Sequence, residues 1–330
     1  MKTQPLLYQI LLKDDLIAVQ KLMLDAIQDL PQVARETVTT LIRQGGKQLR
    51  PALVLLSCRI CEVEQSRALP VAAAVELLHT ATLIHDDLID RADMRRGAET
   101  LNARQFPAVA VLSGDLIFAW AARLASRGQN HRLTERFAET LVTICKGELD
   151  QMFKRNLRLT LEEYEAHIYA KTASLFSLAT ETGALINERA GYQAQYARQF
   201  GKLLGEAFQI NDDVLDIAGD AVTLGKPVGS DLQQGIFTLP VLYYLEEHSD
   251  DATLSEQIRT VATGAADAVS REIALRDLLD AVRSSTAIER ALAQAETRIA
   301  TALELLATRP PSPCRDAMEE IARFAVQRRY

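Results

Sequence analysis

Residues 71 to 85 read VAAAVELLHTATLIH, an apolar stretch that leads directly into the acidic residues of IHDDLID. Neither glycine nor proline interrupts this stretch, and it is much longer than an ordinary strand. Its apolar residues would surround a helix on every side, which is typical of a helix buried inside a bundle. The stretch therefore predicts a central helix that ends in a group of carboxylates.

The rest of the chain shows the same helical periodicity. From Leu16 to Leu30, apolar residues recur at intervals of three and four, and alternation of period two is scarce throughout. We expect a second central helix over 108 to 125, Pro70 in the first turn of a helix, and Gly183 at a helix end. No stretch of linker composition divides the chain, so the sequence predicts an all-α protein with a single domain over residues 1 to 330.

The composition of the 330 residues is that of a globular protein, with 48% apolar residues and 15 glycines. Lys and Arg number 37 against 44 Asp and Glu, and the net charge of -7 argues against a surface for nucleic acid or anionic lipid. The first residues lack the pattern of a signal peptide, and charges such as Glu76 and Asp115 interrupt the long apolar runs. We therefore expect a cytoplasmic protein without a transmembrane segment, and peripheral contact with a membrane stays open.

Two acidic clusters follow apolar runs and share the pattern D-D-x-x-D. The first comprises Asp86, Asp87 and Asp90, and the second comprises Asp212, Asp213 and Asp216. Residues i and i+4 of a helix lie on one face, so the outer carboxylates of each cluster would repel one another unless they share cations. A solvated acidic helix end is the alternative, but two copies at helix C-termini, where the dipole disfavours acids, argue against it. Oxygen ligands of this kind favour Mg²⁺, which takes further ligands from phosphate groups, so the sequence predicts a phosphorylated ligand.

Basic residues occur where such a ligand would need them. Lys47 and Arg50 precede a helix that begins near Pro51, and Arg95 and Arg96 follow the first cluster. Arginine and lysine are the usual partners of phosphate oxygens. Either pair alone could be a solvated surface patch, but their placement around an acidic cluster favours a binding site.

His79 would lie on the same helix face as Asp86 and Asp90, because it precedes them by seven and eleven residues. A core histidine with satisfied hydrogen bonds is the alternative interpretation. Glu76 and His79 also form a single E-x-x-H pattern, whereas a carboxylate-bridged di-iron bundle needs two such pairs. The di-iron interpretation is therefore weak.

Five motifs together resemble the trans-isoprenyl diphosphate synthases: GGKQLRP from 45, HTATLIHDDLIDRADMRRG from 79, KTASL from 171, FQINDDVLD from 208 and LGKPVGSD from 224. They occur in the order of that family, and the last residues also look like those of its long-chain bacterial members. The resemblance implies an all-α isoprenoid synthase bundle of roughly a dozen helices around a central cavity, acting as a dimer. It also implies that the chain condenses isopentenyl diphosphate with an allylic diphosphate such as farnesyl or geranylgeranyl diphosphate.

The resemblance also implies roles for single residues. Three Mg²⁺ ions would bind the allylic diphosphate, with Asp86, Asp90 and Asp212 as direct ligands and Asp87, Asp213 and Asp216 acting directly or through metal-bound water. The other positions implied by the family are Arg95, Lys171 and Lys226 for the allylic diphosphate, Gly46, Lys47, Arg50, His79 and Arg96 for isopentenyl diphosphate, and Thr172 and Gln209 beside the allylic cation. A dry apolar cavity would protect that cation from water, and the departing diphosphate would accept the final proton.

The residues just before the first cluster predict a long product. In the family, the positions four and five residues before the first aspartate form the floor of the product cavity, and bulky aromatics there stop chain growth. This chain has Thr82 and Ala81 at these positions, and Leu78 and Val75 continue the wall without an aromatic. We expect a hexaprenyl to octaprenyl product of the kind used for quinone side chains. The alternative is that Ala81 is small only to let two helices pack closely.

One departure from the family pattern follows the second cluster. Where many relatives carry G-K-x-T, residues 235 to 238 read GIFT, so Ile236 replaces a lysine. A similar absence is familiar in catalytic subunits of two-component hexaprenyl and heptaprenyl diphosphate synthases. The sequence is therefore compatible with a homodimer and with a heterodimer that includes a small regulatory subunit.

Proteins with other functions would differ from this chain in product, site or sequence. A short-chain synthase would differ only in product length, and a class I terpene cyclase would not need the predicted isopentenyl diphosphate site. A non-catalytic partner subunit would be expected to have lost aspartates, whereas all six are present. A carboxylate-bridged metal bundle would bind metal without diphosphate.

Overall fold

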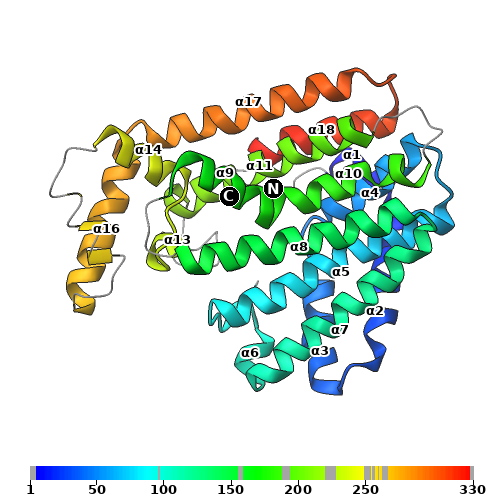
Figure 1. The fold of residues 1–330 in the computed structure, drawn as a ribbon, viewed down its shortest axis with the longest axis horizontal. Coiled ribbons are helices and arrows are strands. Elements are labelled where there is room, and N and C mark those ends of the chain that lie inside the picture. Colours follow the sequence, from blue (N-terminus) through cyan, green and yellow to red (C-terminus); the bar gives the residue numbers. More distant parts are fainter. Residues whose placement is uncertain are drawn as a thin grey trace. The chain divides into compact units, whose positions relative to one another are not determined.

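The computed structural model describes residues 5–95, 97–154, 159–187, 194–219, 228–248, 254, 257–258, 260–261 and 267–327. Helices make up nearly all of the regular structure in these ranges (Figure 1). The two short strands described, β1 (Met94–Arg95) and β2 (Ala98–Glu99), form an antiparallel hairpin in which Met94 lies opposite Glu99. The prediction of an all-α protein is confirmed.

The helices follow one another along the chain, mostly with short connections. The first half contains α1 (Leu7–Leu11), α2 (Lys13–Ala26), η1 (Ile27–Asp29), α3 (Gln32–Arg43), α4 (Leu49–Ile60), α5 (Gln65–Ile89), α6 (Leu101–Arg104), α7 (Pro107–Ala125), η2 (Ser126–Gly128) and α8 (His131–Lys154). The second half contains α9 (Leu161–Ile168), η3 (Tyr169–Ala173), α10 (Ser174–Ile186), α11 (Ala194–Ala218), α13 (Ser230–Gln233), α14 (Leu239–Glu247), α16 (Ala268–Ser284), α17 (Ala287–Ala307) and α18 (Pro313–Gln327).

These elements form two compact units. The first comprises Met1–Val142, Leu175–Gly201 and Leu305–Ile321, and the second comprises Thr143–Ser174, Lys202–Glu304 and Ala322–Tyr330. The first aspartate cluster belongs to the first unit and the second cluster to the second unit. The single domain over residues 1 to 330 stays a prediction, as does the central cavity.

Helix α5 is the centre of the first unit. It contacts α2, α4 and α7, and its residues from Val71 to Ala81 are almost all buried. Helix α7 runs beside it in the opposite direction, because His85 lies against Gly114 whereas Val71 lies against Gly128 (Figure 1). A Cβ atom on Gly114 would lie 2.2 Å from His85 Nε2, so the glycine allows close packing where α5 ends. The predicted central helix over 71 to 85 is confirmed.

Two expectations about helix ends are wrong. Pro70 lies inside α5 rather than in its first turn, because the helix begins at Gln65 with residues that favour a helix. Gly183 lies within α10, where a Cβ atom would come within 2.2 Å of the carbonyl oxygen of Ser57. The Ser57 hydroxyl donates to the Thr180 carbonyl at 2.6 Å and accepts from Gly183 N at 3.0 Å. Gly183 is therefore required by the close approach of α4 and α10, not by a turn.

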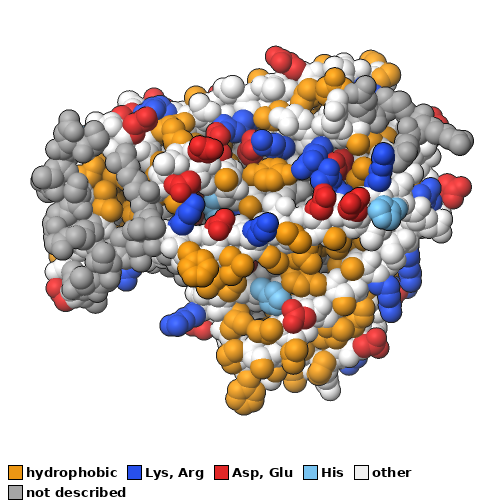
Figure 2. All heavy atoms as spheres, in the orientation of Figure 1, with side chains coloured by type: hydrophobic (Ala, Val, Ile, Leu, Met, Phe, Trp, Pro, Cys, Tyr) orange, Lys and Arg blue, Asp and Glu red, His pale blue; other side chains and the backbone are white. Residues whose placement is uncertain are grey.

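Helix α7 is only partly covered, contrary to the expectation of a second central helix. Ala110, Ile117 and Ala121 are fully buried, whereas Leu112 is 68% exposed and Phe106, just before the helix, is 79% exposed. Figure 2 shows apolar side chains gathered on the surface over this part of the molecule. Both faces of α7 are apolar, and the described residues of the first unit cover one of them.

In the second unit, the C-terminal part of α11 is held from several sides. Arg283 of α16 donates from Nε to the carbonyl of Ile217 at 2.8 Å. Arg298 of α17 forms ion pairs with Glu206 at 3.3 Å and with Glu165 of α9 at 2.6 Å. These contacts fix the helix that carries the second aspartate cluster.

Two helical segments are long and apolar enough to cross a membrane, judged by length and composition alone. They are Gln65–Ile89 and Pro107–Gly128, with mean hydropathies of 1.3 and 1.5 over 18 residues. Both segments contain charged residues, and the expectation of no transmembrane segment stays a prediction. Buried core helices pass the same test, so the result is weak evidence for a membrane span.

Candidate active site

The first aspartate cluster lies at the C-terminal end of α5. Asp86 lies in the last turn and Asp90 is the C-cap residue, whose N–H donates to the carbonyl of Asp86 at 2.8 Å. Both residues are half-buried, whereas Asp87 is only 4% exposed. The two outer carboxylates therefore leave the helix one turn apart, and the middle one points into the protein.

Arg95 is paired with this buried aspartate. It lies in β1, and its Nε donates to Asp87 Oδ1. Burial raises the pKa of Asp87, the Arg95 guanidinium opposes this rise, and the neighbouring Asp90 adds to it. The structure thus brings Arg95 to the first cluster, while Arg96 lies outside the described residues.

The predicted isopentenyl diphosphate residues of the first unit lie around the connection from α3 to α4. Gln48 adopts a left-handed conformation (φ 51°) and leads into α4, which carries Arg50. The Arg50 guanidinium lies 4.7 Å from the centre of the Phe176 ring, in a cation–π arrangement. Gly46 and Lys47 belong to the connection itself, and the Lys47 carbonyl accepts a hydrogen bond from Tyr8.

Helix α5 carries the remaining predicted residues of this unit. His79 is half-buried, and its carbonyl accepts a hydrogen bond from the Thr82 hydroxyl at 2.8 Å. Ala81 is fully buried and Thr82 is half-buried. Because the Thr82 hydroxyl bonds to its own helix, its methyl group is the part available to an apolar chain. The role of these two residues in product length stays a prediction.

The second aspartate cluster lies in the last turns of α11. Asp213 is 3% exposed, and both of its carboxylate oxygens are hydrogen-bonded: Tyr164 Oη donates to Oδ2 at 2.7 Å and Gln209 Nε2 donates to Oδ1 at 2.8 Å. Burial and the nearby charges of Asp231 and Asp212 raise the pKa of Asp213 to about 8, although the two hydrogen bonds oppose the rise. Asp213 is therefore held by neutral donors, and Asp212 beside it is half-buried.

Asp216 is also buried, and it binds the chain that returns after the cluster. Its Oδ1 accepts from Ser230 Oγ at 2.7 Å, its Oδ2 accepts from Asp231 N at 3.2 Å, and its carbonyl accepts from Gly229 N at 2.7 Å. Gly229 has φ +73°, which a glycine adopts without strain. Lys226, predicted to bind the allylic diphosphate, lies outside the described residues.

A short π-helix, η3, carries two more predicted residues. Such segments are rare and occur frequently at functional sites. Within it, the Thr172 hydroxyl donates to Gln209 Oε1 at 2.6 Å, and Gln209 in turn donates to Asp213. Thr172, Gln209 and Asp213 thus form one hydrogen-bonded chain that connects η3 to the second cluster, with Tyr164 at its far end.

Lys171, also in η3, contacts two polar residues of α8. Its Nζ lies 3.6 Å from Glu148 Oε1 and 3.5 Å from Gln151 Oε1. Gly147 precedes them, and a Cβ atom there would lie 2.4 Å from the Cβ of Ala170. The glycine therefore lets α8 approach η3 closely enough for Glu148 and Gln151 to hold the lysine.

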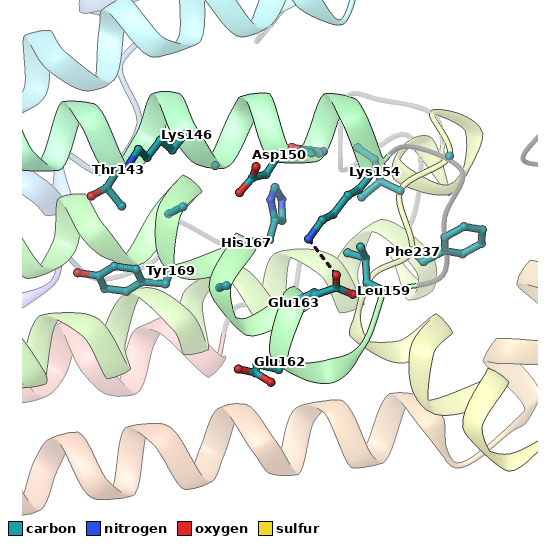
Figure 3. A pocket seen from close by; sticks show the side chains of 16 residues that line it. Thr143, Lys146, Asp150, Lys154, Leu159, Glu162, Glu163, His167, Tyr169 and Phe237 are labelled. Carbon is teal, nitrogen blue, oxygen red and sulfur yellow. Dashed lines mark hydrogen bonds and ion pairs between the residues drawn. The ribbon is translucent and has the colours of Figure 1, made fainter.

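A cavity of about 400 Å³ lies in the second unit between α8, α9 and the residues around Phe237 (Figure 3). His167 points into it, and burial together with nearby Lys171 lowers the pKa of this histidine to about 3, so the imidazole is neutral. Lys154 spans the cavity to form an ion pair with Glu163 at 2.9 Å. Ile236, which replaces the lysine of the family pattern, lines this cavity.

The donor set fits Mg²⁺. In the described ranges, no group of three carboxylate, histidine or cysteine side chains is arranged to hold a metal ion by itself. This is the usual situation for Mg²⁺, which binds through one or two carboxylates and completes its shell with water and substrate phosphates. Burial is the main cause that raises the pKa of Asp87 and of Asp213, and a neighbouring acid adds to each rise, so a nearby cation would favour the ionised carboxylates.

Three residues beside the predicted ones were not predicted from the sequence: Tyr164, Glu148 and Gln151. Tyr164 is 49 residues from its partner Asp213, and no local pattern indicates that contact. Glu148 and Gln151 had a signal, because they follow a glycine inside a helix and are spaced to lie on one helix face. The interior of the second cluster therefore depends on a long-range partner, whereas Asp87 of the first cluster pairs with Arg95, eight residues further along the chain.

The model of the family described as polyprenyl synthetase matches residues 31–275. The chain belongs to the polyprenyl synthetase family. It is therefore a prenyltransferase, and the fold class predicted from the resemblance is confirmed.

Similar members of the family differ in the products that their names give. The chain is 35% identical to heptaprenyl diphosphate synthase component 2 of Geobacillus stearothermophilus over 97% of each chain. It is also 35% identical to the short chain isoprenyl diphosphate synthase of Methanothermobacter thermautotrophicus, over 93% of this chain and 94% of that one. The crystal structure of a polyprenyl synthase from Caulobacter crescentus, complexed with calcium and isoprenyl diphosphate, superposes with a TM-score of 0.90, 33% identity and 98% coverage of both chains.

Proposed function

We propose that this polyprenyl synthetase joins isopentenyl diphosphate to an allylic diphosphate in a Mg²⁺-dependent reaction and builds a long-chain all-trans polyprenyl diphosphate. The observation that carries the proposal is a difference in burial among the aspartates of the two clusters. Asp86, Asp90 and Asp212 are half-buried, whereas Asp87, Asp213 and Asp216 are buried and hydrogen-bonded. The first group suits metal ligands, and the second group suits residues that orient them.

The allylic diphosphate would be bound by this charge pattern. When bound, Mg²⁺ neutralises the diphosphate and makes it a leaving group; we expect three ions, held by Asp86, Asp90 and Asp212. Arg95, Lys171 and Lys226 add positive charge. Asp87 orients Arg95, and Glu148 and Gln151 orient Lys171, so that two of these cations are held in place before substrate binds.

Thr172 and Gln209 are suited to stabilise the allylic cation. The Gln209 amide is oriented by its donor contact to Asp213, so its oxygen faces the Thr172 hydroxyl. Oxygen dipoles fixed in this way can face positive charge without reorganisation. The bond forms when the double bond of isopentenyl diphosphate attacks the cation, and the departed diphosphate accepts the proton that is lost.

Isopentenyl diphosphate would be bound without metal by cations alone. The residues assigned to it are Gly46, Lys47, Arg50, His79 and Arg96. An Arg96→Ala variant should raise the KM for isopentenyl diphosphate more than that for the allylic substrate. Equal effects on both constants would contradict this assignment.

The small residues Ala81 and Thr82 support a hexaprenyl to octaprenyl product of the kind used for quinone side chains. A short-chain product is the second candidate, because one relative of equal identity is named for it. The Ala81→Phe variant separates the two, since an aromatic in the product path should shorten the products at retained turnover. An unchanged product distribution would mean that the growing chain does not pass this residue.

The direct experiment uses the purified full chain with isopentenyl diphosphate, farnesyl diphosphate and Mg²⁺, followed by chromatography of the dephosphorylated products. Long polyprenols that disappear in EDTA are expected. Full activity in EDTA would contradict the metal assignment, and a product no longer than geranylgeranyl would establish the short-chain alternative. Conversion of the allylic substrate alone into a hydrocarbon would identify a terpene cyclase instead.

A second subunit is part of the proposal. The exposed apolar residues of α7 support a dimer, because large apolar patches usually mark interfaces. The relative named component 2 supports a heterodimer with a small regulatory subunit, and the absence of a lysine at Ile236 agrees with it. Sedimentation of the purified chain distinguishes a homodimer from a monomer that awaits a partner. We further expect a cytoplasmic location, with transient membrane contact for product release.

A further inference from the structure

Tyr8 in the short helix α1 reaches the connection that carries Lys47. Its side chain is completely buried, and its hydroxyl donates to the Lys47 carbonyl oxygen, 39 residues further along the chain. Burial and the neighbouring charge of Glu320 raise the pKa of Tyr8, so the hydroxyl stays protonated and remains a donor. A buried hydroxyl of this kind holds the backbone of Lys47 at one place.

The connection itself needs such support. Gln48 has φ 51°, a left-handed conformation that is unfavourable for a residue with a side chain. A Cβ atom on Gly45 would lie 2.8 Å from the carbonyl oxygen of Ile42, so the chain turns tightly there. Gln20 Nε2 also donates to the Ile42 carbonyl at 3.4 Å. The conformation on both sides of Lys47 is therefore maintained by contacts from outside the connection.

Helix α1 is fixed on its other side by the C-terminal helix α18. The backbone N–H of Leu7 donates to Glu320 Oε2, which satisfies a donor of the first helical turn. Leu7 and Glu320 are 313 residues apart in the chain and belong to the same compact unit. Helix α1 therefore lies between two partners: Leu7 contacts Glu320 of α18, and Tyr8 contacts the backbone of Lys47.

We propose that Tyr8 is a positioning residue for isopentenyl diphosphate: it fixes the backbone of Lys47 so that Lys47 and Arg50 are in place before the diphosphate arrives. The inference rests on the proposed function, because Lys47 and Arg50 are the cations assigned to that substrate. Tyr8 itself does not touch the substrate. Its effect is on the cost of ordering the site, so it should appear in the affinity for isopentenyl diphosphate and not in the chemical step.

The test is steady-state kinetics of the Tyr8→Phe variant of the full chain with both substrates. Loss of one such hydrogen bond should raise the KM for isopentenyl diphosphate about tenfold, with kcat and the KM for the allylic diphosphate within about twofold of wild type. Tyr196→Phe is the matched control, because Tyr196 is 42% exposed, and it should change none of these constants. Unchanged isopentenyl diphosphate affinity in Tyr8→Phe, or equal rises of both KM values, would overturn the inference.

A double-mutant cycle distinguishes an effect through Lys47 from a general packing defect. If Tyr8 acts through Lys47, Tyr8→Phe should change the KM for isopentenyl diphosphate much less in a Lys47→Ala background than in wild type. A general packing defect would give the same factor in both backgrounds, and the inference would then be wrong. Circular dichroism and thermal unfolding establish that all variants are folded. If the wild-type chain makes no prenyl product from isopentenyl diphosphate with farnesyl or geranylgeranyl diphosphate, the proposed function itself is contradicted. If the wild-type chain is active and Tyr8→Phe has unchanged kinetics, only this inference is contradicted.

Discussion

The two aspartate clusters have the same pattern but stabilise their buried aspartate differently. In the first unit, Asp87 is paired with the guanidinium of Arg95. In the second unit, Asp213 accepts hydrogen bonds from the neutral side chains of Tyr164 and Gln209 and lies near a further acid, Asp231. The first cluster thus contains its own positive charge, whereas the second depends on dipoles and on cations from outside. One sequence pattern can therefore be part of two different electrostatic designs.

The largest effect is expected where the clusters are alike. Asp86→Ala or Asp212→Ala should each lower kcat by ~10³-fold or more while the chain stays folded, because each would remove a proposed metal ligand at the developing charge. Turnover at saturating Mg²⁺ measures the effect, and the exposed residue Asp29 provides the control variant Asp29→Ala. A cluster that tolerates the loss of its outer aspartate would not be a metal site.

Another buried carboxylate, Glu181, tests whether a nearby arginine offsets burial. Burial raises the pKa of Glu181 to about 7, although Arg136 at 2.9 Å and Arg198 lower it. The folded state therefore binds the proton more tightly than the unfolded state, and the free energy of unfolding should fall as pH rises from about 4.5 to 7, by about 3 kcal/mol.

Urea unfolding at pH 5 and pH 8 measures this loss. Glu181→Gln should remove most of it, so that the variant gains about 3 kcal/mol relative to wild type between the two pH values. Glu139→Gln is the control, because Glu139 contacts the same Arg136 but is 54% exposed. Equal pH dependence in Glu181→Gln and wild type would show that the arginines do offset the burial.

The neutral donors of the second cluster should matter for catalysis. Tyr164→Phe removes one hydrogen bond from the buried Asp213 and so weakens the hydrogen-bonded series that continues to Gln209 and Thr172. We expect a fall in kcat of roughly 30-fold and a higher Mg²⁺ concentration for half-maximal rate, with the KM for isopentenyl diphosphate unchanged. A variant with normal Mg²⁺ dependence would mean that Tyr164 only packs the core.

The arginine of the first cluster should act on binding instead. Arg95→Lys keeps the charge but loses the planar guanidinium that contacts Asp87 and that we propose to bind the diphosphate, so the KM for the allylic diphosphate should rise about tenfold. Arg104→Lys, at an arginine with a 39% exposed side chain, is the control. If Arg95→Lys lowers kcat without changing this KM, the prediction that Arg95 acts on binding while Tyr164 acts on catalysis is wrong.

The smallest effect is expected at Ile236. A lysine there would enter the cavity that already holds the Lys154–Glu163 pair, so Ile236→Lys should lower the KM for the allylic diphosphate by only a few-fold. Ile273→Lys, at a residue 46% exposed on α16, is the control. A folded variant with unchanged affinity would indicate that another cation or a partner subunit already supplies this charge.

The sequence predicted those parts of the site that depend on local spacing. Periodicity gave α5 and its two outer carboxylates, because i and i+4 geometry follows from the helix itself. It could not give the pairing of Tyr164 with Asp213 or of Tyr8 with Lys47, since these contacts join distant segments. Gly183 shows the same limit, because its partner is the carbonyl of Ser57, 126 residues away. Arg96 and Lys226 lie outside the described residues, so their assignments stay predictions.

The π-helix at Tyr169–Ala173 contains one residue more than an α-helix of the same height. Deleting one residue from this segment would turn it into a regular α-helix, while α9 and α10 on either side could keep their packing contacts. The side chains at the joint would rotate by about 100° relative to α8, so Lys171 would lose Glu148 and Gln151. A one-residue gap here in an alignment of related sequences would therefore mark a change of active-site design, even where every neighbouring helix is retained.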